Sequence, residues 1–156
     1  MFSAYEYAVD QENPILERRE ILLRAILEVG MTLEGRKVLV TDDEPDEQDF
    51  IVAVLEDAGA TVLKAHNGDQ ALELAESEQP DIVTLDITMP GMDVFQVLDA
   101  LQNNGYRKDM KICIVSGRPE LRRVLTDRFR AKALGIVDKP FTQEELLANL
   151  IELVKD

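Results

Sequence analysis

Three aspartates follow apolar runs that predict buried strands. Asp86 ends the apolar run of residues 82–85, and a Met-Pro-Gly turn follows it closely. Because proline cannot donate a backbone hydrogen bond, the strand is expected to stop there and to leave Asp86 at its C-terminal tip. Asp42 and Asp43 follow the apolar run of residues 38–40 in the same way. Ligands of open α/β sheets bind at the carboxyl ends of the strands, so these carboxylates are candidates for chemistry.

Two other polar residues follow predicted strands, Ser116 and Lys139. Carboxylates a few Å apart at one sheet edge repel each other by about 3–4 kcal/mol per pair at an effective dielectric near 20. A divalent cation relieves this repulsion, and an all-oxygen ligand set favours Mg²⁺. A carboxylate can form an aspartyl phosphate, and phosphoryl transfer depends mainly on positioning and charge neutralisation. The set therefore predicts a site that receives a phosphoryl group, with Asp86 as nucleophile.

The elements that must position these residues alternate from residue 37 onward. Helical periodicity separates five apolar runs that predict strands at residues 37–41, 61–65, 81–86, 112–115 and 136–137. Five successive strand–helix units predict an α/β fold, a doubly wound parallel sheet of five strands with right-handed crossovers.

The N-terminal segment, residues 1–34, has a different pattern and is predicted to be an extension. It contains an amphipathic helix at about residues 14–29, which begins at Asn13-Pro14 and ends at Gly30. The wide apolar stripe of this helix can pack on its own domain or pair with a second copy, which would give a homodimer.

Composition limits the possible partners. The 156-residue chain has a formal net charge of −14, which opposes direct binding of nucleic acid and of anionic membranes. It has no apolar run long enough to span a membrane. The one cysteine, Cys113, lies in an apolar run and is interpreted as a core thiol. These features favour a cytoplasmic location.

Basic residues gather in one region, between Arg118 and Lys132. Six of the 17 lysines and arginines lie there. A solvated helix face, with pairs to Glu120 and Asp127, is the favoured interpretation. A contact with a partner or with a second copy is the alternative.

Residues 37–156 resemble the receiver domain of two-component response regulators, the CheY-like family. The resemblance rests on VLVTDDEP at residues 38–45, DIVTLDITMPGMD at 81–93, IVSG at 114–117 and VDKPF at 137–141. It implies a flavodoxin-like receiver domain, which we place at residues 35–156.

The resemblance also implies roles for single residues. Asp86 would accept the phosphoryl group from a histidine kinase or a phosphotransfer protein. Asp42, Asp43 and Asp86 would hold Mg²⁺ together with the backbone carbonyl of Thr88.

Ser116 and Lys139 would bind the phosphoryl oxygens, and the bond between Lys139 and Pro140 would be cis. Thr88 and Arg118 occupy positions that, in the family, set how long the phosphoryl group survives.

Two positions depart from the family pattern. Val94 stands where a glycine is usual, so the loop beyond Asp86 is expected to take a different path. Ile136 replaces the usual switch aromatic three residues before Lys139. Phosphorylation is therefore expected to be intact, while its transmission is expected to be altered.

The chain ends with the last predicted helix, so no DNA-binding output domain is expected and the output is expected to be protein contact. The chain would be a signalling domain rather than an enzyme, limited to phosphotransfer and dephosphorylation at its own aspartate. The alternatives are a scaffold that ignores phosphate and a receiver fragment of a hybrid kinase. An aspartyl phosphohydrolase is disfavoured, because Thr88 stands where its acid/base aspartate would be.

Overall fold

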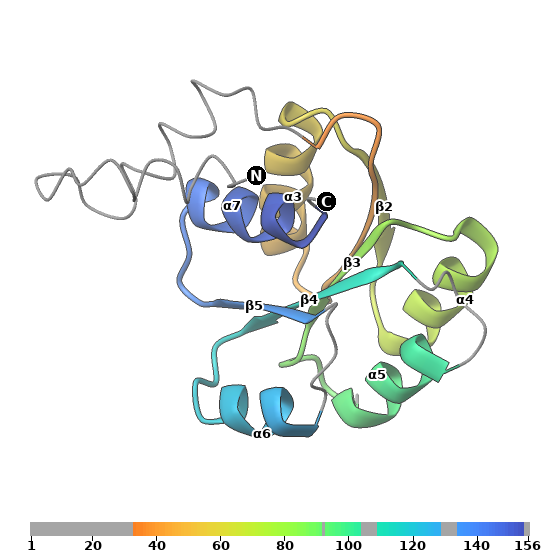
Figure 1. Cartoon of the computed structure of the whole chain (residues 1–156), viewed down its shortest axis with the longest axis vertical. Helices are drawn as coiled ribbons and strands as arrows, with labels where there is room; N and C mark the ends of the chain where they lie inside the picture. The colour runs from red at the N-terminus through yellow and green to blue at the C-terminus, as the bar shows by residue number, and fades with distance from the viewer. Residues whose placement is uncertain (1–32, 92, 104–108, 129–133, 155–156) are drawn as a thin grey trace, which may run out of the picture.

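The computed structural model describes residues 33–91, 93–103, 109–128 and 134–154. These residues form one five-stranded parallel sheet in the order β2-β1-β3-β4-β5 (Figure 1). The strands are β1 (Lys37–Thr41), β2 (Thr61–Ala65), β3 (Ile82–Asp86), β4 (Lys111–Ser116) and β5 (Leu134–Asp138). The helices are α3 (Pro45–Asp57), α4 (Gly68–Glu78), α5 (Val94–Asn103), α6 (Leu121–Arg128) and α7 (Gln143–Val154). The predicted doubly wound five-stranded sheet is confirmed.

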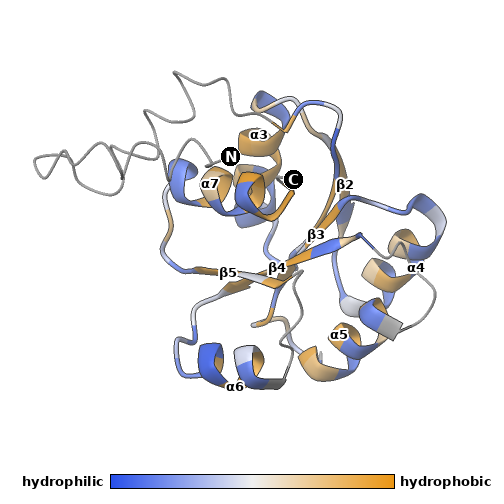
Figure 2. Ribbon diagram, viewed as in Figure 1, coloured by the Kyte–Doolittle hydropathy of each residue, from blue (hydrophilic) through white to orange (hydrophobic). Residues whose placement is uncertain are grey.

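The helices cover both faces of the sheet. In Figure 1, α3 and α7 lie on one face, and α4, α5 and α6 lie on the other. Figure 2 shows largely hydrophobic strands between helices of mixed character, with α6 the most hydrophilic of them. This layering buries β1, β3 and β4 on both sides, which is why these three strands read as nearly continuous apolar runs.

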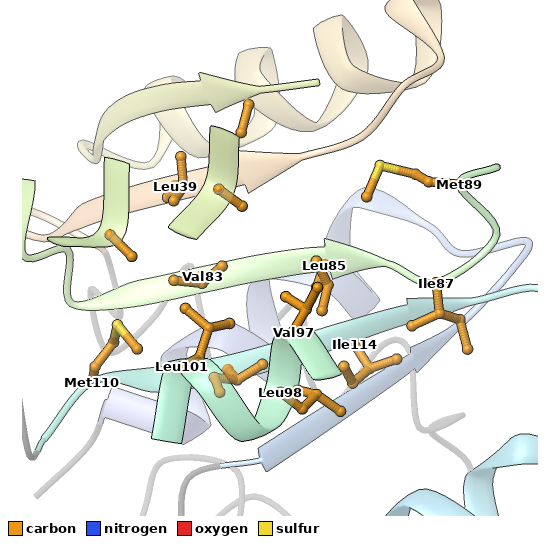
Figure 3. Packing of buried hydrophobic residues seen from close by; sticks show 14 of the residues in the cluster. Leu39, Val83, Leu85, Ile87, Met89, Val97, Leu98, Leu101, Met110 and Ile114 are labelled. Atoms are coloured by element: carbon orange, nitrogen blue, oxygen red, sulfur yellow. The ribbon is translucent and has the colours of Figure 1, made fainter. Parts of the chain in front are cut away.

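Two hydrophobic clusters result, one on each face. On one face, β3 and β4 pack against α5 through the side chains labelled in Figure 3, among them Val83, Leu85, Ile114, Val97, Leu98 and Leu101. On the other face, Val38 and Val40 of β1 pack with residues of α3 and α7. Cys113 lies fully buried in the second cluster, and burial raises the pKa of its thiol to about 12. It is the inert core thiol that the sequence predicted.

Local signals explain where the helices begin. Pro45 takes the first position of α3, and the Glu44 side chain accepts a hydrogen bond from the Asp46 N–H. Asn67 caps α4 by accepting from the Gln70 N–H. At the start of α7, the Thr142 hydroxyl accepts from the Glu145 N–H, which is one of the two hydrogen bonds of a capping box.

The predicted bounds of β3, β4 and β5 differ from the observed ones by a residue or two, and the difference is largest at β5. Strand β5 begins at Leu134 rather than at residue 136, so it includes Gly135. A Cβ at Gly135 would lie 2.9 Å from Leu153, so glycine allows α7 to approach the strand closely. Leu33, which the predicted boundary assigns to the extension, is buried in the cluster between α3 and α7.

The predicted helix at residues 14–29 lies outside the described residues. Among the helices that are described, none has both the length and the apolar composition needed to cross a membrane.

Candidate functional site

The strand register brings the predicted site residues to one edge of the sheet. Thr41 of β1 pairs with Leu85 of β3, and Asp86 pairs with Val115 of β4. Asp42, which follows β1, therefore lies at the same edge as Asp86 and as Ser116, which ends β4. All three are buried, with exposed fractions of 1%, 2% and 3% for Asp42, Asp86 and Ser116.

Lys139 reaches this edge from the end of β5. Its backbone N–H donates to the Ser116 carbonyl over 2.7 Å, which fixes the start of the following loop. The bond between Lys139 and Pro140 is cis, as the resemblance implied.

Both carboxylate oxygens of Asp86 accept hydrogen bonds. Oδ1 accepts from the Thr88 hydroxyl at 2.7 Å and from the Thr88 backbone N–H at 2.9 Å. Oδ2 accepts from Lys139 Nζ at 3.0 Å. Burial by itself would raise the pKa of Asp86, but these donors stabilise the charged form and hold the pKa below its usual value. The group is therefore an ionised carboxylate, as a nucleophile requires.

Asp42 has the opposite electrostatic situation. Its Oδ1 accepts from the Glu44 N–H at 2.9 Å, while its buried Oδ2 finds no hydrogen-bond partner among the described residues. Burial raises the pKa of Asp42 to about 7, and the negative charges of Asp86 and Glu47 add to the shift. A buried carboxylate oxygen without a donor would be stabilised by a cation bound next to it.

A divalent cation fits this position. Carboxylate oxygens of Asp42, Asp43 and Asp86 all lie within 4.8 Å of one another. Asp43 is exposed while the other two are buried, so one side of the cluster is open to solvent. Three carboxylates on an open site match Mg²⁺, which keeps several waters when it is bound.

Lys139 is the cation that the structure places at the site. Its ammonium lies 3.0 Å from Asp86 Oδ2 and 2.7 Å from Glu47 Oε1. Burial opposes the charged form, but the two ion pairs outweigh burial and raise the pKa of Lys139. The lysine therefore stays charged throughout the neutral range.

Ser116 lies at the predicted edge, but its hydroxyl is engaged with its own loop. Ser116 Oγ donates to the Arg118 carbonyl at 3.1 Å and accepts from the Arg118 N–H at 2.9 Å. The Arg118 guanidinium pairs with Glu120 at 3.0 Å on the exposed surface. In this arrangement neither group forms a hydrogen bond with Asp86.

Two residues of α3 that the sequence did not single out shape the site. Glu47 holds Lys139, as described above. Gln48 is buried, and its Nε2 donates to the carbonyls of Val40 and Ala65, so it ties the ends of β1 and β2 together beside Asp42. The available signal was their position: both come within five residues of Asp43 and lie in the first turns of a helix that starts at the site.

Val94 and Ile136, the two departures from the family pattern, lie in a regular helix and a regular strand. Val94 is the first residue of α5, and Asp93 before it caps this helix by accepting from the N–H groups of Phe95 and Gln96. Ile136 is partly buried against the cluster beneath α5 and α6. The predicted effect of both residues on transmission stays a prediction.

The arginines of the predicted basic region that are described pair with acidic neighbours. Arg118 contacts Glu120, Arg123 contacts Asp127, and Arg122 contacts Asp138 of β5. These contacts fit the solvated-face interpretation and lend no support to a homodimer. The side chains of the remaining basic residues lie outside the described part.

Comparison with known proteins gives the family. Residues 38–151 match the family model of the response regulator receiver domain. This chain belongs to that family. As a receiver domain of a response regulator, it is a signalling domain of two-component systems and not a classical enzyme.

Individual relatives support the same family. Protein PilH of Pseudomonas aeruginosa is 35% identical over 117 residues, which cover 73% of this chain and 93% of PilH. Response regulator MprA of Mycobacterium ulcerans is 33% identical over 119 residues, 76% of this chain. The match spans only 50% of MprA, so this receiver corresponds to about half of that protein.

Solved structures show the same fold. The chemotaxis response regulator CheY4 of Vibrio cholerae superimposes with a TM-score of 0.68 at 28% identity, over 76% of this chain and 98% of CheY4. TrrA of Thermotoga maritima, solved in complex with Mg²⁺-BeF, superimposes with a TM-score of 0.67 at 30% identity. That match covers 76% of this chain and 99% of TrrA.

Proposed function

We propose that Asp86 accepts a phosphoryl group from a phosphohistidine of a histidine kinase or phosphotransfer protein, and that the modification switches protein–protein contacts. The observation that carries this proposal is the ionised, buried carboxylate of Asp86 between Thr88 and Lys139, beside the unpartnered oxygen of Asp42. Such a carboxylate needs no base to become a nucleophile, because it has already lost its proton.

The transfer needs no reactant other than the phosphohistidine and a proton from solvent. An oxygen of Asp86 forms a bond to phosphorus while the bond from phosphorus to the donor imidazole nitrogen breaks. The electron pair of that bond stays on the nitrogen, which takes up a proton from solvent. The charge that develops on the phosphoryl oxygens is the main obstacle, so positioning and charge neutralisation supply most of the catalysis.

Asp42, Asp43 and Asp86 would hold Mg²⁺ with the backbone carbonyl of Thr88. When bound, the ion neutralises phosphoryl oxygens and relieves the repulsion among the three carboxylates. The arrangement of the three carboxylate oxygens supports this assignment, as does the Mg²⁺-BeF complex of the relative TrrA.

Lys139 and Ser116 would bind the phosphoryl oxygens. Lys139 already lies 3.0 Å from Asp86 Oδ2, so its ammonium has only a short way to move. Ser116 would exchange its hydrogen bonds with Arg118 for one to the phosphoryl group, which would release the loop that leads into α6. That release would carry the signal to the surface formed by α6 and β5.

Asp43 exposes one side of the carboxylate cluster to solvent, and we expect a donor to approach from that side. A hollow of about 170 Å³ adjoins it, lined among others by Asp43, His66, Asp69, Met89 and Asp93. It lies between the loop after β2 and the loop after β3. The proposal includes a cytoplasmic location, which fits the single unpaired cysteine.

Acetyl phosphate labelling tests the proposal. With Mg²⁺, intact-mass measurement of the wild-type protein should show the addition of one phosphoryl group, and Asp86→Asn should abolish it. Asp69→Asn, an exposed aspartate beside the hollow, should leave labelling intact. The proposal would be overturned if wild type takes no label from acetyl phosphate with Mg²⁺ and also shows no response to beryllofluoride. It would likewise be overturned if labelling persists in Asp86→Asn. Either result would favour a phosphate-independent scaffold.

A further inference from the structure

Glu47 shares the lysine of the site with the nucleophile. Its Oε1 lies 2.7 Å from Lys139 Nζ, which is closer than the 3.0 Å between that ammonium and Asp86 Oδ2. The Glu47 side chain is 25% exposed and the Lys139 side chain is 22% exposed, so solvent only partly screens this pair. The pair joins the first turn of α3 to the end of β5, two segments that are far apart in the sequence.

The charge balance at the site makes this contact consequential. Four carboxylates, those of Asp42, Asp43, Glu47 and Asp86, face a single ammonium among the described residues of the site. A lysine ammonium carries three donors and can serve two acceptors at once. A phosphoryl group on Asp86 would bring further oxygens that need the same ammonium.

We propose that Glu47 is a positioning residue that competes with the phosphoryl group for Lys139 and so weakens the phosphorylated state. This inference rests on the proposed phosphorylation of Asp86. The Glu47 carboxylate holds the ammonium toward α3, and binding of phosphoryl oxygens requires that contact to lengthen or break. The same carboxylate repels the incoming anion, so both effects act in one direction.

Beryllofluoride binding in the presence of Mg²⁺ measures the effect without any phosphotransfer. Glu47→Gln keeps the shape of the side chain and removes its charge. It should tighten beryllofluoride binding by roughly three- to tenfold, the range of a partly screened ion pair. The affinity can be followed by ¹⁹F NMR or by the shift of the thermal unfolding midpoint.

Two variants separate the contact from general electrostatics. Glu47→Asp keeps the charge but shortens the side chain, so it loses the contact and should bind beryllofluoride more tightly than wild type. Asp46→Asn removes an exposed charge from the same helical turn and should leave the affinity within about twofold of wild type. Because residues 46 and 47 both stand in the first turn of α3, both substitutions carry a similar cost in helix stability.

The role of Lys139 is tested by comparing the effect of Glu47→Gln with and without this lysine. In a Lys139→Gln background, Glu47→Gln should change the affinity less than in wild type, because the contested ammonium is gone and only the repulsion of the anion by Glu47 remains. The Nζ resonance of Lys139 should also move in the Glu47→Gln protein. The inference is overturned if the affinity of Glu47→Gln equals that of wild type, or if Glu47→Gln acts equally in both backgrounds. Wild type that binds no beryllofluoride and takes no label at Asp86 would refute the proposed function itself.

Discussion

Asp42 and Asp86 stand at the carboxyl ends of the neighbouring strands β1 and β3, and their pKa values are shifted in opposite directions. Burial dominates at Asp42, where one oxygen has no donor among the described residues, and raises the pKa to about 7. At Asp86 burial acts in the same direction, but Thr88 and Lys139 donate to both oxygens and lower the pKa. The site thus contains one carboxylate that is already stabilised and one that needs a cation.

The pH dependence of stability follows from Asp42. A carboxyl whose folded pKa lies above its unfolded value stabilises the fold below the unfolded pKa, near 3.8, and loses that contribution as pH rises through the folded pKa, about 7. Asp42→Asn cannot ionise, so without metal it should become more stable than wild type as pH rises from 4.5 to 8. The gain should be on the order of 2–4 kcal/mol at pH 8, measured by urea unfolding.

Asp43→Asn is the matched control for this prediction. Asp43 is exposed, so its substitution should change the metal-free stability by no more than about 0.5 kcal/mol. If Mg²⁺ stabilises wild type as proposed, both variants should lose that stabilisation, because each removes a proposed ligand. Equal metal-free stabilities of Asp42→Asn and wild type at pH 8 would contradict the burial argument.

The Thr88 hydroxyl helps to lower the pKa of Asp86, the proposed nucleophile. Thr88→Val removes the 2.7 Å hydrogen bond to Asp86 Oδ1 and keeps the backbone N–H. The pKa of Asp86 should rise, since a donor to the charged form is lost. Asp86 has a lowered folded pKa, so its contribution to stability is present above about pH 4 and is lost as pH falls. In the variant, this loss should begin at a higher pH.

Carboxyl ¹³C NMR titration of the metal-free protein measures the change at Asp86. Ser116→Ala provides the comparison, because the Ser116 hydroxyl bonds Arg118 and not Asp86. This variant should titrate at Asp86 as wild type does. A Thr88→Val protein with an unchanged Asp86 titration would show that the hydroxyl does not support the charged form.

The sequence could predict the edge of the sheet because the physics there is local. Buried parallel strands read as apolar runs, and the polar residue at the end of each run marks the strand tip. The pattern of apolar runs is therefore sufficient to place four side chains at one edge, those of Asp42, Asp86, Ser116 and Lys139. The cis bond at Pro140 came from the resemblance alone.

Other features depend on tertiary packing and leave little trace in the sequence. Glu47 and Gln48 are polar residues in a helical first turn, a pattern that equally describes a solvated face. Which of them turns toward the site depends on how α3 docks against β1 and β2. The start of β5 was missed because Gly135 lowers the strand signal, although it is the residue that lets Leu153 pack. The hydroxyl of Ser116 could point either to its loop or to the nucleophile, and the residue type does not distinguish the two.

Gln48 forms buried hydrogen bonds next to Asp42. Its Nε2 donates to Val40 O at 3.2 Å and to Ala65 O at 2.9 Å, and Ala65 O also accepts from the Asp42 N–H. Gln48→Leu should destabilise the protein by about 1–3 kcal/mol, because it removes buried hydrogen bonds that water cannot replace. The stabilisation by Mg²⁺ should shrink as well. Gln102→Leu, the same change at an exposed position of α5, should stay within about 0.5 kcal/mol of wild type in urea unfolding.

The ion pair between Arg122 and Asp138 connects α6 to the residue directly before Lys139. The two side chains are 50% and 48% exposed, so solvent and salt screen their attraction. A double-mutant cycle of Arg122→Ala and Asp138→Asn should give a coupling of about 0.2–1 kcal/mol at low salt, and less at 1 M salt. In the proposed mechanism, so weak a pair would open readily when Lys139 moves toward the phosphoryl group. A coupling above about 2 kcal/mol that does not change with salt would show instead that the pair is a fixed structural link.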